Sequence, residues 1–213
     1  MLNLRKYRQV IFDCDGVILN SNDVKSEAFS KSLAGESVEL IQEFIDYHKN
    51  NGGVSRFVKF EHFFRNIKKQ KHYKSDLNKA LKKYSKLSLE GLLLSDEIDG
   101  VRSVLKFLNV LNIDCFVVSG GEQNEVRLAL KSQGLSQYFK GVYGSPMTKQ
   151  EHLLNIKPTE SLYFGDAVSD YVAATVFDMD FVYISGASDW LGGTDFCRSE
   201  GVRVMEDFSK LII

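Results

Sequence analysis

The chain of 213 residues alternates short apolar runs, rich in β-branched and aromatic residues, with stretches of helical periodicity. Runs of this length and composition predict buried strands. Strands that alternate with helices predict right-handed crossovers and a mostly parallel sheet covered on both faces, which is an α/β fold. The expected strands lie at 10–12, 113–118, 141–143, 161–164 and 181–184, with a short edge strand at 202–204. We expect helices at 125–133 and 169–177, and a last helical turn at 208–212.

A long segment after the first expected strand has helical periodicity alone. From about residue 22 to 96 no strand pattern occurs, and Phe57, Phe60, Phe63, Phe64 and Ile67 follow helical spacing. We therefore expect a core domain of residues 1–20 plus 97–213 and a helical domain of residues 21–96. The insert must leave the sheet at the carboxyl end of the first strand, where it can cover a bound ligand.

Composition excludes several classes of protein. Hydrophobic residues make up 44% and charged residues 26%, which is typical of a globular protein. The net charge of -1 gives no sign of affinity for nucleic acid or membranes, and we expect a monomer or weak homodimer. Apolar runs are too short for a membrane span or signal peptide, so we expect a cytoplasmic protein. The three cysteines are widely spaced, which favours reduced thiols over disulfides or a zinc site.

Two aspartates follow the first apolar run one residue apart, at the start of a glycine turn. In an extended segment side chains i and i+2 point the same way, so Asp13 and Asp15 can face one small volume. Two like charges this close need a metal ion, a proton or different roles. This placement predicts an active site.

Further polar groups follow the other expected strands. Ser119 with Gly120 and Gly121 follows the second, Lys149 comes shortly after the third, and Asp166 and Asp170 follow the fourth. The carboxyl ends of parallel strands lie along one edge of a sheet, where ligands usually bind. Alone, each residue has an ordinary explanation, such as a turn former, a helix cap or an exposed lysine. The ordered set favours a single catalytic site.

These motifs, in this order, resemble the four motifs of the haloacid dehalogenase-like superfamily of phosphotransferases. The resemblance rests on Asp13-x-Asp15-Gly16-Val17, Ser119, Lys149 and Gly165-Asp166-x-x-x-Asp170, and it spans essentially the whole chain. It implies a Rossmann-like parallel core. The insert between the first two motifs resembles the helical cap of the phosphoglycolate phosphatase and β-phosphoglucomutase branch.

The resemblance also implies a role for each motif residue. Asp13 is expected to attack phosphorus and form an aspartyl-phosphate, with Asp15 as general acid and base. Mg²⁺ is expected as cofactor, held by Asp13, by Asp166 and by the backbone carbonyl of Asp15. Ser119 and Lys149 are expected to hold the transferring phosphoryl group. Asp170 is expected at the metal site, where it orients either metal-bound water or Lys149.

Four further residues are candidates for substrate binding. Gly16 and Gly120 belong to the core motifs, whereas Arg56 and Lys25 belong to the insert. Arg56 follows a glycine-rich turn that resembles a substrate-specificity loop, and the alternative is a helix start capped by Ser55. Lys25 stands where related mutases typically have a histidine that gates proton transfer, and this departure counts against mutase activity.

Two other features of the insert leave alternatives open. His48 and His62 flank the Arg56 loop and are either pocket-lining or packing residues. The basic stretch from Arg65 to Lys86 is either a solvated helical face or a surface that steers anionic substrates or contacts a polyanion weakly.

The sequence therefore predicts a Mg²⁺-dependent phosphatase that acts on a small phosphorylated metabolite. A sugar phosphate or a phosphoglycolate-like acid is favoured, and a nucleotide monophosphate is the further alternative. An acid at Asp15 argues against dehalogenation, because a leaving halide needs no proton. The rival functions are a phosphomutase and a non-catalytic module that binds a phosphorylated ligand.

Overall fold

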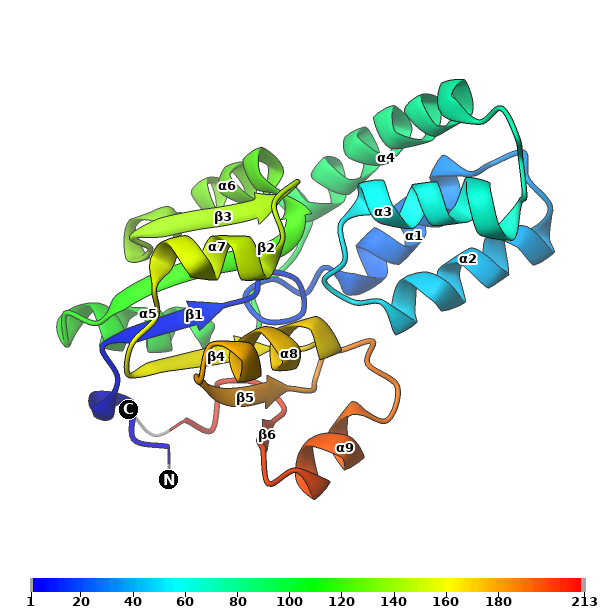
Figure 1. Ribbon diagram of the computed structural model, residues 1–213. Coiled ribbons are helices and arrows are strands. Elements are labelled where there is room, and N and C mark those ends of the chain that lie inside the picture. Colours follow the sequence, from blue (N-terminus) through cyan, green and yellow to red (C-terminus); the bar gives the residue numbers. More distant parts are fainter. Residues whose placement is uncertain (1, 212–213) are drawn as a thin grey trace.

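A computed structural model describes residues 2–211 and contains a six-stranded parallel sheet in the order β3-β2-β1-β4-β5-β6 (Figure 1). The predicted α/β fold is confirmed, and every predicted strand is present among these residues. The strands are β1 Gln9–Phe12, β2 Asp114–Glu122, β3 Gly141–Ser145, β4 Ser161–Gly165, β5 Asp180–Ile184 and β6 Arg203–Met205.

Alternating side chains of the sheet contribute to two apolar layers. Val10 and Phe12 of β1 pack with helices α5 and α6, whereas Ile11 packs with α7 and α8 on the opposite face. Both faces are covered, as expected for a parallel sheet. The helices of this part are α5 Val101–Val110, α6 Gln123–Ser132, α7 Lys149–Ile156, α8 Val168–Val176 and α9 Gly193–Ser199, with 3₁₀ turns at Leu4–Lys6 and Ser136–Tyr138.

The segment between β1 and α5 is helical and has an apolar core of its own. Its elements are α1 Asn22–Ser32, α2 Val38–Asn50, α3 Arg56–His62, a π-helical segment at Phe63–Ile67, and α4 Lys74–Leu94. Phe29 and Phe60 pack there against Tyr84 from α4, and Phe44 packs against both phenylalanines. This confirms an all-helical cap inserted after the first strand, and we call helices α1–α4 the cap. The domain boundaries at 20/21 and 96/97 stay a prediction.

The cap lies beyond the carboxyl ends of the strands, since the arrowheads of β1 and β2 point toward it (Figure 1). The chain enters the cap after β1 and returns through α4, whose contacts with α6 join the two parts. This arrangement places the cap over the edge of the sheet where the sequence motifs gather.

Three local predictions need correction. Strand β2 continues through Ser119 to Glu122 instead of ending at Ser119, although its pairing with β3 is irregular between Val118 and Glu122. Phe208 to Leu211 forms a turn, closed by the N–H of Leu211 on the carbonyl of Phe208, and not a helical turn. Ile212 lies outside the described residues.

The third correction concerns Phe57, which is 42% exposed although its spacing predicted a place in the apolar stripe. Phe60 and Phe63 are fully buried. Phe57 lies in the first turn of α3, ahead of the π-helical segment that carries the buried Phe63, Phe64 and Ile67. Helical spacing places a side chain on a face of the helix but does not say how far along the helix neighbouring elements cover that face.

Replacement of Phe60 by alanine tests the cap core. Because Phe60 is fully buried among aromatic rings, we expect Phe60→Ala to lower the free energy of unfolding by about 3–5 kcal/mol. Phe57→Ala on the same helix is the matched control and should change it by less than about 1 kcal/mol. Urea denaturation measures both, and equal losses would contradict the assignment of Phe60 to the core.

Candidate active site

Asp13 follows the last residue of β1 and is held by backbone hydrogen bonds. Its N–H donates to the carbonyl of Phe164 in the adjacent strand β4 at 2.9 Å. Its Oδ1 accepts from the N–H of Cys14 at 2.7 Å. The carboxylate is buried, so its position depends on the pairing of the two central strands.

Asp166 and Asp170 reach the same volume from the end of β4 and the first turn of α8. One carboxylate oxygen of each lies within 4.8 Å of the others and of an oxygen of Asp13. Asp170 Oδ2 accepts from the backbone N–H of Ala167 at 3.1 Å, so this side chain also satisfies the start of the helix. Asp166 Oδ2 accepts from Asn22 Nδ2 of the cap at 2.7 Å.

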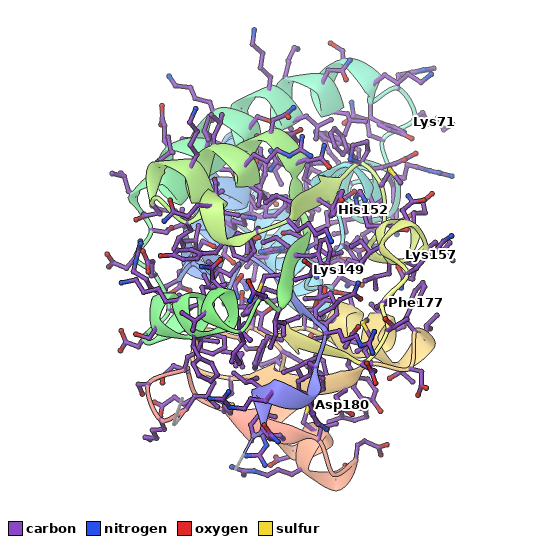
Figure 2. All side chains as sticks on the ribbon, turned by 90° about the vertical axis from the view of Figure 1, so that its left-hand side faces the viewer. Lys71, Lys149, His152, Lys157, Phe177 and Asp180 are labelled. Atoms are coloured by element: carbon purple, nitrogen blue, oxygen red, sulfur yellow. The ribbon has the colours of Figure 1, made fainter. Side chains whose placement is uncertain are left out.

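Lys149 supplies positive charge to this acidic cluster. It begins α7, which Thr148 and Glu151 cap reciprocally, and it is labelled in Figure 2. Its Nζ lies 2.5 Å from Asp170 Oδ1 and 3.0 Å from Asp13 Oδ2. Burial alone would lower the pKa of Lys149, but the carboxylates of Asp13 and Asp170 raise it above the usual range. Lys149 is therefore a fixed cation.

The negative charge in this volume exceeds the positive charge. Burial, with the neighbouring carboxylates of Asp170 and Asp15, raises the pKa of Asp13 to about 7, although Lys149 opposes the shift. Burial and Asp13 also raise the pKa of Asp166 well above its usual range. Crowded, buried oxygen ligands of this kind suit a hard divalent cation, which would relieve their repulsion. The residues present thus fit the expected Mg²⁺.

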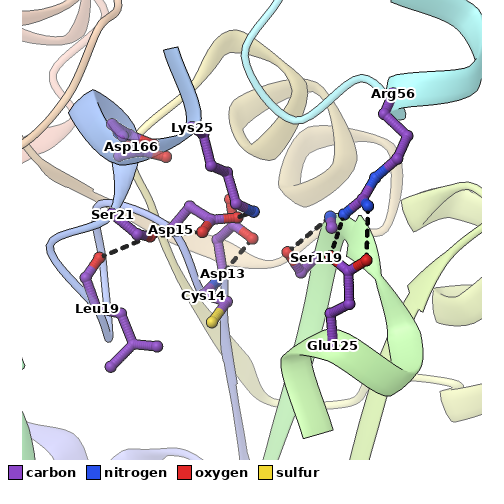
Figure 3. A network of polar contacts seen from close by, with 12 residues as sticks. Asp13, Cys14, Asp15, Leu19, Ser21, Lys25, Arg56, Ser119, Glu125 and Asp166 are labelled. Carbon is purple, nitrogen blue, oxygen red and sulfur yellow. Dashed lines mark hydrogen bonds and ion pairs between the residues drawn. The ribbon is translucent and has the colours of Figure 1, made fainter. Parts of the chain in front are cut away.

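Asp15 lies beside Asp13 but has its own partners (Figure 3). Its Oδ1 accepts from Ser21 Oγ at 2.5 Å, and its Oδ2 forms an ion pair with Lys25 Nζ. Burial alone would raise the pKa of Asp15, but Lys25 and then Ser21 outweigh burial and lower it. The two aspartates therefore differ in protonation behaviour despite being one residue apart, with Asp15 held as a carboxylate.

The glycines of the core motifs shape the loops around these acids. Gly16 has a φ of +73°, and its N–H donates to the carbonyl of Leu19 at 2.8 Å. A side chain at this position would collide with Asp166. Contact of Gly16 with substrate stays a prediction, and the hydrogen bond within the loop occupies its N–H.

Ser119 lies at the far end of β2, next to the glycine pair. Its Oγ accepts from the N–H of Gly121 at 3.1 Å, and the side chain is buried. A Cβ on Gly120 would collide with the carbonyl oxygen of Gly53, which belongs to the cap loop between α2 and α3. The cap is therefore closed on the core, and backbone packs against backbone at this point.

Arg56 makes a contact between the cap and the core that the sequence did not predict. Its guanidinium donates to both carboxylate oxygens of Glu125 on α6, at 2.7 and 2.5 Å, and lies over the ring of Tyr84 (Figure 3). Arg56 lines the cavity, so its role in substrate binding stays a prediction. Its positive charge is already paired with the carboxylate of Glu125. Ser55 precedes α3 without a side-chain capping bond.

A cavity of about 70 Å³ lies between the cap and the strand ends. Several predicted site residues line it, namely Asp13, Asp15, Lys25, Arg56, Gly120 and Asp166. The other four, Gly16, Ser119, Lys149 and Asp170, lie behind this lining. Lys149 forms ion pairs with Asp13 of the lining and with Asp170.

Cap residues that the sequence reading did not assign to the site also line the cavity. Asn22 does so while bonded to Asp166, and Lys59 does so from α3. His48 is on the wall as well, whereas His62 stacks on Tyr47 away from it. Helical periodicity places a residue on a face of the cap but does not say which face meets the core, so the sequence carried no signal for Lys59.

The comparison with family models decides the family. Residues 10–184 match the model described as haloacid dehalogenase-like hydrolase, and this range contains all four motifs. The chain belongs to this family. The resemblance found in the sequence is therefore confirmed for the family.

Solved structures show that this hydrolase shares its whole fold with known members. A predicted phosphoglycolate phosphatase from Haemophilus somnus superposes with a TM-score of 0.77 at 16% identity, covering 98% of each chain. A β-phosphoglucomutase from Clostridium difficile gives a TM-score of 0.76 at 18% identity, covering 97% of this chain and 94% of the other. No curated protein sequence matches the hydrolase significantly. Within residues 2–211, no helix has the length and apolarity needed to cross a bilayer.

Replacement of Arg56 and Glu125, singly and together, tests how strongly their ion pair joins the cap to the core of the hydrolase. Removing one partner leaves the other charge buried, so Arg56→Met or Glu125→Met alone should cost about 3–5 kcal/mol in the free energy of unfolding. The double variant should cost less than the sum of the two. Urea denaturation of the four proteins measures this coupling. The exposed pair Lys31–Glu27 is the control, with an expected coupling of less than about 1 kcal/mol.

Buried His48 predicts a pH dependence of stability. Burial and the nearby charge of Lys59 lower the pKa of His48 to about 2, whereas the unfolded chain has a histidine pKa of about 6.5. Between these values only the unfolded state binds the proton, so stability falls as pH decreases below about 6.5. From pH 7 to pH 5 the wild type should lose about 2 kcal/mol more than His48→Gln, measured by urea denaturation. Equal decreases in the free energy of unfolding of wild type and His48→Gln would contradict this assignment to His48.

Proposed function

We propose that this hydrolase is a Mg²⁺-dependent phosphatase that acts on a small phosphorylated metabolite through an aspartyl-phosphate. The observation that carries the proposal is that Asp13 and Asp166 line one cavity, with Lys149 behind the lining and in contact with Asp13. A carboxylate nucleophile, a set of oxygen ligands and a fixed cation are the groups that phosphoryl transfer requires.

Asp13, Asp166 and the backbone carbonyl of Asp15 would hold the metal ion. When bound, Mg²⁺ neutralises charge on the phosphoryl oxygens and so permits a carboxylate to approach. Asp170 has a different part in this proposal, because Lys149 and the backbone N–H of Ala167 occupy its two oxygens. Its role is to position Lys149 against Asp13.

The reaction divides between the two neighbouring aspartates. An oxygen of Asp13 forms a bond to phosphorus as the ester oxygen leaves. Asp15 delivers a proton to that leaving oxygen in its protonated form, which the negative charge of a bound phosphate ester favours over the carboxylate of the free protein. Asp15 then accepts a proton from the water that attacks the aspartyl-phosphate, which frees inorganic phosphate and Asp13. Lys25 suits the second step, since it favours the ionised form of Asp15. Lys149 and Ser119 hold the phosphoryl group during both steps.

The substrate is a small phosphate ester, with sugar phosphates and phosphoglycolate-like acids as the main candidates. A cavity of about 70 Å³ supports a small ligand, because one water molecule needs roughly 10–15 Å³ measured in this way. The protein acts as a monomer or weak homodimer without nucleic acid. The basic residues of α4 are mostly exposed, which agrees with a solvated helical face.

The second candidate function is a phosphomutase. Structural likeness to a β-phosphoglucomutase favours it, whereas lysine at position 25, where the mutases typically have histidine, argues against it. In a mutase, the aspartyl-phosphate must survive until the substrate has reoriented in the active site for the second phosphoryl transfer. Isomer formation without net phosphate release would therefore favour this alternative. The assay is incubation with a hexose 1-phosphate and quantification of phosphate and isomer.

Measurement of phosphate release tests the proposed function. With a panel of phosphate esters, wild type should release phosphate with Mg²⁺ and stop with excess EDTA. Asp13→Asn should lower kcat by about a thousandfold or more, because an amide is not a nucleophile here. Asp178→Asn is the matched control, since this exposed aspartate has a φ of +50° that asparagine tolerates. Equal inactivity of wild type and Asp13→Asn across the panel would favour a non-catalytic binding module.

A further inference from the structure

Lys59 is a buried cation in the cavity wall that the proposed reaction does not use. It lies on α3 one turn after Arg56, is 3% exposed, and lines the cavity together with Asp13 and Asp15. A buried lysine in a cleft is a candidate for function, because an ammonium group loses much of its hydration there.

The other basic side chains on the cavity wall have carboxylate partners. Lys25 pairs with Asp15, Lys49 with Asp189 at 3.3 Å, and Arg56 with Glu125. For Lys59 no carboxylate lies within 4 Å among residues 2–211. Its charge is therefore the one uncompensated basic group on this wall.

The hydrogen bonds of Lys59 are with neutral groups of a single residue, and its Nζ also lies 5.7 Å from the centroid of the Phe29 ring. Its Nζ donates to Nδ1 of His48 at 2.7 Å and to the carbonyl of His48 at 3.2 Å. The histidine is held in turn by Ser26 Oγ, 3.1 Å from Nε2. An ammonium group has three N–H donors, and within residues 2–211 hydrogen-bond acceptors satisfy two of those of Lys59. His48 thus fixes the position of the amine without neutralising its charge.

The surroundings of Lys59 disfavour its charge in the free protein. Burial, with repulsion from Lys25, lowers the pKa of Lys59 to about 7. An anion that enters the cavity would supply the missing partner and favour the charged form. The interaction that compensates Lys59 is therefore one that the chain itself does not provide.

We propose that Lys59 binds a carboxylate of the substrate, and so selects phosphorylated carboxylic acids over phosphate esters that lack a carboxylate. His48 positions the amine for this contact. The inference rests on the proposed phosphatase function and names the class of substrate. A carboxylate fits better than a second phosphate, because it is the smaller group and the cavity of about 70 Å³ has room for roughly five to seven water-sized positions.

Matched pairs of esters test this selection. Phosphoglycolate is compared with ethyl phosphate, and 3-phosphoglycerate with glycerol 3-phosphate, so that each pair differs by the carboxylate. Wild type should favour the acid in kcat/KM. In Lys59→Met this preference should fall about 10- to 100-fold, the range for one charge-assisted hydrogen bond, and the change should lie mainly in KM. Lys59→Arg should restore part of it. Lys79→Met, on an exposed part of the cap, should keep the wild-type preference.

Binding to an inactive protein separates this inference from the proposed function. Calorimetry with Asp13→Asn and Mg²⁺ should show tighter binding of each acid than of the paired ester that lacks the carboxylate, and Asp13→Asn/Lys59→Met should lose the difference. Equal binding of the acid and of its paired ester to Asp13→Asn would overturn the selection whether or not the wild type turns over the substrate. Phosphate release with a preference that Lys59→Met leaves unchanged would overturn it while leaving the phosphatase intact.

A stability measurement guards against a folding artefact. Because methionine removes an uncompensated buried charge, Lys59→Met should have a Tm at least as high as wild type. Lys59→Gln, which keeps a donor toward His48, serves as a second variant. It should show the same loss of preference, and a full wild-type preference in Lys59→Gln would overturn the role of the charge.

Discussion

Crowding of like charges at the carboxyl edge of the sheet is the constraint on which the rest of this structure depends. Parallel strands bring Asp13 and the Asp166–Asp170 pair into one buried volume, where each carboxylate disfavours ionisation of the next. Lys149 offsets part of this repulsion because it touches both Asp13 and Asp170. What remains is negative potential at the base of the cavity, which explains why a metal ion and then a phosphate ester are suitable occupants.

The cap adds charge of the opposite sign above this base. Lys25 reaches Asp15, Lys49 reaches Asp189 and Arg56 reaches Glu125, so three of its basic side chains form ion pairs with the core. Asn22 adds a hydrogen bond to Asp166. The cap core is aromatic and independent of the sheet, which lets the cap be a stable unit that touches the core mainly through polar groups. Such contacts exchange readily with water, whereas an apolar interface would not.

The sequence predicted the strands and the core of the site because both depend on local information. Short apolar runs identify buried strands, and residues that follow parallel strands must share one edge, so Asp13, Lys149 and Asp166 could be grouped without coordinates. The pairing of Arg56 with Glu125 could not be predicted, since the residues are 69 positions apart and on different parts of the fold. Lys59 was missed for a related reason, because burial between two units depends on how they meet. Phe57 was misplaced because helical spacing does not say how far along α3 neighbouring elements cover the apolar face.

The close approach of Gly53 to Gly120 has a consequence for the timing of catalysis. With backbone packed on backbone there, side-chain rotation alone cannot widen the cavity at this point, and the cap loop must move as a unit to open it there. In the proposed reaction every turnover would then include separation of Arg56 from Glu125 and its reversal. The rate of product release, and with it the upper limit of kcat, would then depend on an ion pair that takes no part in the chemical steps.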